Sequence, residues 1–100
     1  MFAIVRINTF DPDKFDPQAP EVQAFNRLHA SQPGYAGSLS VELGENRRLV
    51  VNLWQSERDA TAALAALGSE VGRVLEPLMA APSQLLGAGQ VVETDLTHGA

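Results

Sequence analysis

The sequence predicts an α+β domain in which one four-stranded antiparallel sheet carries its helices on a single face. Short segments with period-two alternation lie near both ends and in the middle of the chain, and segments with helical spacing separate them. The expected order is strand, helix, strand, strand, two helices and strand, which is the ferredoxin-like split β-α-β arrangement. We expect residues 1–100 to form a single domain with a loosely ordered tail from about residue 96.

The first part of the chain predicts a strand, a loop and a helix. Residues 2–9, FAIVRINT, are rich in β-branched residues and are expected to form the first strand. Prolines and aspartates then predict a loop, and Asp16 before Pro17 is typical of a helix N-cap. A helix over 19–32 is predicted by helical spacing, which Pro33-Gly34 ends. Its apolar face would contain Val22, Phe25, Leu28 and His29.

Residues 35–43 and 47–54 alternate and are joined by Gly-Glu-Asn, so they are expected to form a hairpin. We expect the more apolar set of alternate residues to face the helices. This set is Ala3, Val5, Ile7, Leu39, Val41, Leu43, Leu49, Val51 and Leu53. The opposite face would present Phe2, Ile4, Val50 and Trp54, an apolar area that a second copy of the sheet could cover in a two-fold dimer.

The second half of the chain predicts two helices and a last strand. Ser56 is a typical N-cap for an alanine-rich helix over 57–67, and Gly68 would end this helix. Ser69 would cap a second helix, which Pro77 must kink or divide because proline has no N–H to donate. Residues 89–96, GQVVETDL, are expected to form the fourth strand.

Composition excludes several classes of function. Twelve acidic and seven basic side chains give a net charge of −5 without a basic cluster, which argues against a nucleic-acid partner. No apolar run approaches the ~20 residues that span a membrane. The N-terminus does not resemble a signal peptide, so we expect a cytoplasmic protein. The chain contains no cysteine, and no histidine pair has metal-ligand spacing, so we expect no metal site.

The segment QPGYAGSLSVELGENRRLVVNLWQSERDATAALAAL, followed by EPLMAAP, resembles the antibiotic biosynthesis monooxygenase (ABM) family of the dimeric α/β-barrel superfamily. The resemblance spans Phe2 to about Asp95. The features that carry it are Pro33-Gly34-Tyr35, Trp54 at a strand end, Ser56 as a helix cap and the late Pro77. It implies a homodimer whose sheets pack face to face, with a small-molecule pocket between sheet and helices in each subunit.

The ABM resemblance admits several activities. The family includes cofactor-free oxygenases of polycyclic phenols or quinol-like molecules, haem-degrading oxygenases, isomerases and proteins with no assigned chemistry. The haem-degrading pattern has an asparagine on the first strand, which Asn8 matches. Its tryptophan and histidine-ligand positions correspond to Ala63 and to the vicinity of Glu76, so haem would lack its axial ligand. We therefore expect no cofactor.

Polar and aromatic residues on the face assigned away from the helices are the main candidate site. They could hold a phenolic or carbonyl substrate and stabilise an enolate or phenolate that reacts directly with oxygen. The alternative is that the same residues pair with one another across a dimer interface. The predicted catalytic residues are Asn8, Asn52, Trp54 and His29, and the predicted substrate-binding residues are Arg6, Tyr35, Ser38 and Ser40.

Three aromatic or imidazole side chains keep alternative roles. Trp54 is better interpreted as a pocket wall or interface residue than as a redox group. Tyr35 could pack at a strand start or donate a proton. His29 could act as a general acid or base, or it could be a partly exposed residue at a helix end, where the helix dipole favours its protonated form. His98 lies in the expected tail and is given no role.

The leading functional hypothesis, which rests on the resemblance, is cofactor-independent monooxygenation of an aromatic or quinol-like molecule by a homodimer. A non-catalytic homodimer that binds a small ligand or another protein remains the alternative. An isomerase is the third hypothesis, and it would have a histidine or carboxylate with a perturbed pKa in the pocket.

Overall fold

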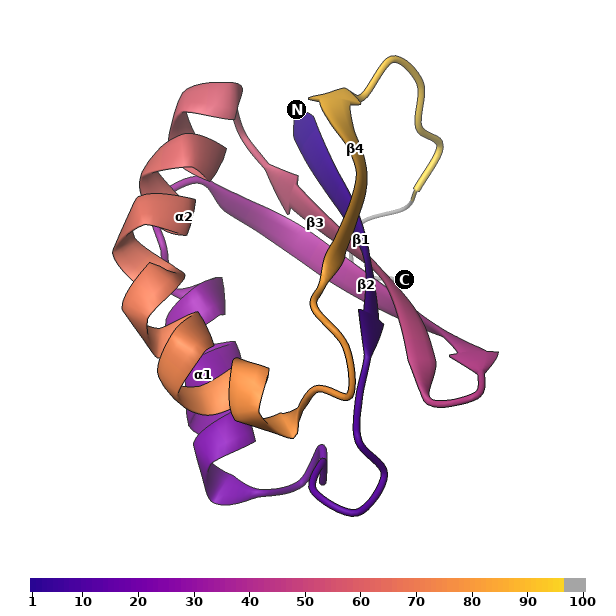
Figure 1. Ribbon diagram of the computed structural model, residues 1–100. Coiled ribbons are helices and arrows are strands. Elements are labelled where there is room, and N and C mark those ends of the chain that lie inside the picture. The colour runs from indigo at the N-terminus through magenta and orange to yellow at the C-terminus, as the bar shows by residue number, and fades with distance from the viewer. Residues whose placement is uncertain (97–100) are drawn as a thin grey trace.

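A computed structural model describes residues 1–96 of the chain. Four strands form one antiparallel sheet in the order β2-β3-β1-β4, and both helices lie on the same face of it (Figure 1). The elements are β1 (Phe2–Thr9), α1 (Pro20–Ala30), β2 (Tyr35–Gly44), β3 (Arg47–Trp54), α2 (Glu57–Glu70) and β4 (Gln84–Gln90). The predicted ferredoxin-like α+β fold is therefore confirmed. Within the described part of the chain, no helix is both long and apolar enough to cross a membrane.

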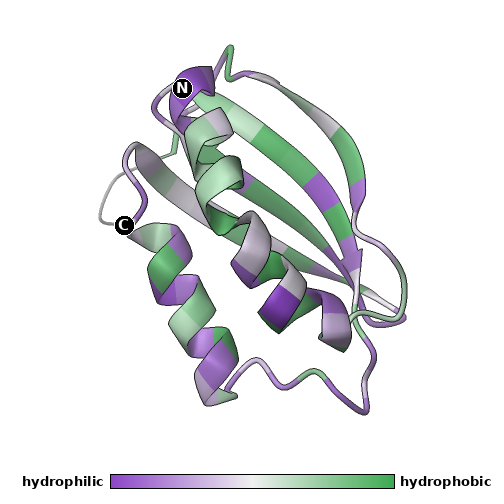
Figure 2. Cartoon of the chain, turned by 60° about the vertical axis from the view of Figure 1, so that its left-hand side comes forward, coloured by the Kyte–Doolittle hydropathy of each residue, from purple (hydrophilic) through white to green (hydrophobic). Residues whose placement is uncertain are grey.

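The faces of the sheet are reversed relative to the sequence-based expectation. Phe2, Ile4 and Trp54 are buried beneath α2, where they form the core with Ala60, Ala63 and Leu67. The set expected beneath the helices lies on the opposite face, and Leu39, Val41 and Leu43 are 44%, 42% and 41% exposed. Hydrophobic residues colour much of the length of the strands in Figure 2. Both faces of this sheet carry apolar residues, so alternation separates the residues into two sets without showing which set meets the helices.

A β-bulge changes the register at the start of β2. Tyr35 lies opposite Trp54 and Gly37 lies opposite Leu53, so Ala36 is the extra residue. Alternation predicts that Tyr35 shares a face with Leu39, but the bulge moves its side chain to the face of Ser38 and Ser40. The bulge thereby brings the tyrosine to the side of the sheet that the helices cover.

The hairpin turn and the second helix cap agree with the predictions. Glu45 and Asn46 both have positive φ, 55° and 62°, which is typical of the two-residue turn that suits a twisted hairpin. The Asp59 backbone N–H donates to Ser56 Oγ at 3.1 Å and satisfies a free donor of the first turn of α2.

Other predicted element boundaries are wrong. Helix α1 begins at Pro20 with Ala19 as its N-cap, whereas the Asp16 carboxylate accepts the Gln18 N–H in a local turn. Helix α2 continues through Gly68, because a single glycine costs only about 1 kcal/mol and Leu67 and the later Val74 are both buried.

After α2 the helix type changes twice before the chain returns to the sheet. Helix α2 passes into a π-helical turn η1 (Val71–Leu75) and a short 3₁₀ turn η2 (Glu76–Leu78), so the change of helix type occurs just before Pro77, as predicted. The last strand was predicted too late in the sequence, because β4 ends at Gln90 and Val92 is 95% exposed. Most of the expected tail, including His98, lies outside the described residues.

Candidate active site

A cavity of about 1100 Å³ lies between the helix-covered face of the sheet and the helices. All the residues predicted as catalytic or substrate-binding line it, although the sequence analysis assigned most of them to the face away from the helices. These residues are Arg6, Asn8, His29, Tyr35, Ser38, Ser40, Asn52 and Trp54. Polar residues therefore lie beneath the helices, where they line a cavity. The more apolar set lies on the opposite face, where its members are partly buried or, for Leu39, Val41 and Leu43, exposed.

A hydrogen-bond chain orients Asn52 at the sheet surface of this cavity. The Tyr35 hydroxyl donates to Ser38 Oγ at 3.1 Å, and the Ser38 hydroxyl donates to Asn52 Oδ1 at 2.7 Å. Ser38 and Asn52 are direct partners across β2 and β3, so the backbone register brings them together. Because Oδ1 accepts within the chain, the Asn52 NH₂ group is the part of the amide that can donate to a ligand.

Asn8, near the C-terminal end of β1, has a similar arrangement. Asn52 lies opposite Ile4, near the start of the same strand. Ser83, in the segment before β4, donates to Asn8 Oδ1 at 2.5 Å. This bond again leaves the amide NH₂ group as the donor that can reach a ligand. Two asparagines on neighbouring strands thus present oriented N–H donors to one cavity, and such donors can stabilise negative charge on a substrate oxygen.

His29, Tyr35 and Trp54 form an aromatic cluster at one wall of the cavity. The His29 ring lies edge-on to both Tyr35 and Trp54, with centroid distances of 5.4 Å, and the Tyr35 and Trp54 rings meet edge-on at 5.7 Å. Phe25 on α1 lies 6.2 Å from the imidazole. Trp54 is only 2% exposed, so its indole packs the wall and its position matches the pocket-wall interpretation.

Burial lowers the pKa of His29 from its ordinary value of 6.5. The helix dipole at the end of α1 favours the protonated form, but loss of hydration in the aromatic cluster has the larger effect. The imidazole is therefore neutral at neutral pH and can accept a proton.

This pKa shift predicts that acidification destabilises the fold. Between the folded pKa of His29 and 6.5 the unfolded chain binds more protons, so the free energy of unfolding falls as pH decreases through this range. We expect the urea midpoint to decrease from pH about 7.5 to pH about 5.5, and to decrease less in His29→Gln. An equal decrease in both proteins would contradict this assignment.

Other cavity residues were not selected by the sequence analysis. Asn26, Arg48, Glu76 and Ser83 all line the cavity. Arg48 alternates in phase with Asn52 and Trp54 on β3, and this pattern could have identified it as a cavity residue. Ser83 is brought to Asn8 only by the tertiary fold. Among residues 1–96 no group of three or more histidine or acidic side chains is arranged to hold a metal ion.

No protein-family model matches the chain, and no curated protein sequence matches it. Solved structures share its fold. SnoaB, a cofactor-independent oxygenase from Streptomyces nogalater, is 18% identical with a TM-score of 0.72, and the match covers 93% of this chain and 94% of SnoaB. A Nitrosomonas europaea protein provisionally assigned as an antibiotic biosynthesis monooxygenase is 14% identical with a TM-score of 0.73, covering 93% of this chain and 100% of that protein.

A structure whose name states no activity shares the fold as well. Rv0793 from Mycobacterium tuberculosis is 10% identical with a TM-score of 0.72, and the match covers 95% of this chain and 98% of Rv0793. Sequence identities this low show a shared fold, and activity must be inferred from the residues of the site. The chain has the fold of proteins that are named antibiotic biosynthesis monooxygenases.

Proposed function

We propose that this chain is a cofactor-independent monooxygenase that oxidises an electron-rich phenolic or quinol-like molecule in the main cavity. The observation that carries the proposal is the oriented amide of Asn52, which presents its NH₂ group to the same cavity that the neutral His29 imidazole lines. SnoaB, which has the same fold, is named a cofactor-independent oxygenase, and this supports the same class of chemistry here.

The proposed reaction needs only the substrate and molecular oxygen. A phenol with hydrogen at its para carbon is deprotonated, and the electron-rich para carbon of the phenolate forms a bond to one oxygen atom of O₂. Protonation and cleavage of the O–O bond then leave one oxygen in a para-quinone and release the other as water. The substrate loses four electrons and O₂ gains four, so no external reductant is required.

Most of the candidate residues have a role that their positions support. His29 accepts the phenol proton, because its lowered pKa keeps the imidazole neutral. The Asn52 NH₂ group donates to the phenolate oxygen, and Tyr35 and Ser38 hold the Asn52 amide in that orientation. Asn8 lies four residues further along the sheet, where its NH₂ group can donate to a second polar group of the substrate. Trp54 closes the wall against which an aromatic ring would stack.

The test is oxygen consumption with a panel of electron-rich phenols such as 1-naphthol, without added flavin or metal. We expect quinone carrying ¹⁸O from labelled O₂. Asn52→Asp keeps the side-chain shape but replaces the NH₂ donor by an acceptor oxygen, and should lower kcat/KM by about 100-fold. Asn46→Asp, in the β2–β3 turn, makes the same chemical change away from the cavity and should leave the rate unchanged.

Two results would reject the proposal. One is a wild-type rate no higher than the uncatalysed background across the panel. The other is an unchanged rate in Asn52→Asp. Ligand binding without turnover would instead support the non-catalytic binding protein, which has the same cavity and needs no reaction.

We also propose that the chain is a homodimer formed through the open face of the sheet, and we expect it in the cytoplasm. The face that no helix covers carries exposed Leu39, Val41 and Leu43 beside the partly buried Val51 and Leu53. A continuous apolar area of this kind favours association, and a second copy supplies a matching surface. The residues of this interface are thus those that the sequence analysis placed beneath the helices.

Sedimentation analysis tests the dimer. The wild-type chain should sediment as a dimer, and Val41→Glu should sediment as a monomer because it would bury a charge within the interface. Leu28→Glu, at an exposed position of α1, introduces the same charge outside that face and should remain dimeric. A monomeric wild-type chain would rule out the interface.

A further inference from the structure

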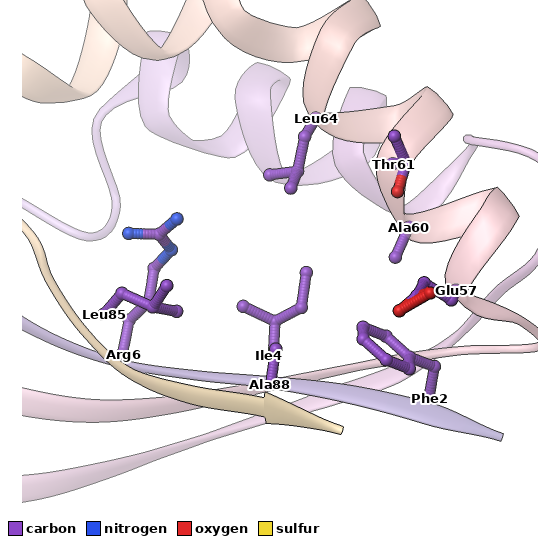
Figure 3. Close-up of a pocket in the computed structure, with 9 residues that line it drawn as sticks. All are labelled: Phe2, Ile4, Arg6, Glu57, Ala60, Thr61, Leu64, Leu85 and Ala88. Carbon is purple, nitrogen blue, oxygen red and sulfur yellow. The ribbon is translucent and has the colours of Figure 1, made fainter. Parts of the chain in front are cut away.

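A smaller hollow of about 210 Å³ lies beside the main cavity, between β1, β4 and the first half of α2. Ile4, Arg6 and Leu64 line both hollows. In Figure 3, Arg6 rises from β1 toward α2 with Leu85 beside it, and Leu64 points down from the helix. The Arg6 side chain therefore borders both hollows.

Arg6 differs from the other arginines in its pairing and burial. Its side chain takes part in none of the ion pairs formed within residues 1–96, and it is partly buried. Those pairs are Arg47 with Glu45 at 4.0 Å, Arg48 with Glu42 at 3.2 Å and Arg73 with Glu70 at 2.6 Å. Arg27 and Arg58 are also outside these pairs, but both are exposed, so water hydrates them. A partly buried guanidinium has fewer water partners and a stronger attraction for an anion.

The backbone beside Arg6 is irregular. The register between β1 and β4 shifts between Val5 and Arg6, where Val5 pairs with Gly87 and Arg6 pairs with Leu85. Leu86 is thus an extra residue in β4, and its exposed fraction is 50%. Bulges are frequent next to binding sites, where they change the direction of a side chain. The bulge places Leu85 against the smaller hollow beside the Arg6 side chain.

The smaller hollow is electrostatically asymmetric. Glu57 lies with Phe2 at the end opposite Arg6, and apolar side chains occupy the space between them (Figure 3). A negative ligand group would be repelled at the Glu57 end and attracted at the Arg6 end. Because the net charge of −5 repels anions from the molecule as a whole, any preference for an anion must arise locally.

We propose that Arg6 binds a carboxylate of the ligand, so that the substrate class is an aromatic carboxylic acid with its ring in the main cavity. The planar guanidinium matches a carboxylate through two parallel N–H donors. The inference rests on the proposed function only in taking the main cavity as the ligand site, and it does not depend on oxidation.

The experiment compares 2-naphthoate with 2-naphthamide, a neutral molecule of nearly the same shape, by titration calorimetry. Wild type should bind naphthoate at least about 10-fold more tightly, because charge-assisted hydrogen bonds are the stronger class. Arg6→Gln should reduce this ratio to about 1, and Arg6→Lys should keep part of it. Arg27→Gln removes the same charge from an exposed position of α1 and should keep the full ratio.

Equal affinity for the two probes in wild type, no binding of either probe, or an unchanged ratio in folded Arg6→Gln would each overturn the proposal. If Arg6→Gln does not fold, the wild-type ratio and its decrease with added salt decide the question, since only the charged probe should respond to salt. Binding is measured without oxygen consumption. A protein that prefers naphthoate but oxidises no phenol would keep the Arg6 site and lose the proposed oxygenase activity.

Discussion

Replacing Trp54 by alanine is expected to lower the free energy of unfolding by about 3–5 kcal/mol, because it removes the most buried large side chain of the core. Domains of this size have a total stability of about 5–15 kcal/mol, so much of the chain would be unfolded at elevated temperature. The indole contacts the aromatic cluster on one side and packs beneath α2 on the other, and neither neighbour can fill the resulting space. Urea denaturation followed by circular dichroism measures the effect, since Trp54 is the single tryptophan.

Two matched variants separate packing from other causes of this loss. Trp54→Phe keeps an aromatic ring and should lose less than half as much stability. Leu28→Ala shortens a side chain that is already 38% exposed and should cost below about 1 kcal/mol. If Trp54→Ala were no more destabilising than Leu28→Ala, Trp54 would not be a structural wall, and its place in the candidate site would need another explanation.

Strand alternation predicted which residues share a face but not which face meets the helices. The apolar set containing Val5 and Val51 was expected to form the core, and the opposite set, in which Phe2 and Trp54 lie among polar residues, was expected to be covered by a second copy of the sheet. In the structure the two faces are reversed: Arg6 and Asn52 line a cavity beneath the helices, and the set containing Val5 and Val51 lies on the face that no helix covers. A single sequence carries no signal that separates an apolar core from an apolar interface.

The fourth strand was misplaced because its residues have low intrinsic strand propensity. Gly87 and Gly89 lie in β4, opposite Val5 and Ala3, although glycine is depleted in strands. The edge of β1 supplies backbone partners that override this preference. Residues 91–96 have the better composition but extend beyond the end of β1, and only the Val91 N–H still reaches the Met1 carbonyl, at 2.8 Å.

The candidate site was predictable in its members but not in its geometry. Alternation placed Asn8, Asn52 and Arg6 on one face of the sheet. The position of His29 at the end of the first helix made it a further candidate, and all four residues line the cavity. The bulge at Ala36 that moves Tyr35, and the long-range contact of Ser83 with Asn8, depend on tertiary packing and leave no local pattern. The hydrogen bond between Ser83 and Asn8 joins residues that are 75 positions apart in the sequence.

Gly34→Ala is expected to cost about 3 kcal/mol of stability, although it adds only one methyl group. Gly34 has φ of +80°, which residues with a Cβ rarely adopt, and an added Cβ would lie 2.3 Å from the Asp59 carboxyl carbon and 2.5 Å from Asp59 Cβ. Asp59 cannot easily withdraw, because its backbone N–H is bonded to the Ser56 cap of α2. Gly34 also accepts the Gln55 N–H at 2.8 Å, which aligns Tyr35 with the end of β3.

Gly44→Ala distinguishes the clash from backbone strain, because Gly44 has φ of +88° and open space around the site of an added Cβ. This variant should lose only about 1 kcal/mol, measured by the same urea titration. The double variant Gly34→Ala with Asp59→Gly removes the side chain in the path of the methyl group. It should be more stable than the sum of the two single changes predicts, because the clash is present in Gly34→Ala alone and absent from the double variant. Strict additivity would mean that strain alone makes Gly34 necessary before Tyr35, and that its approach to α2 has no energetic role.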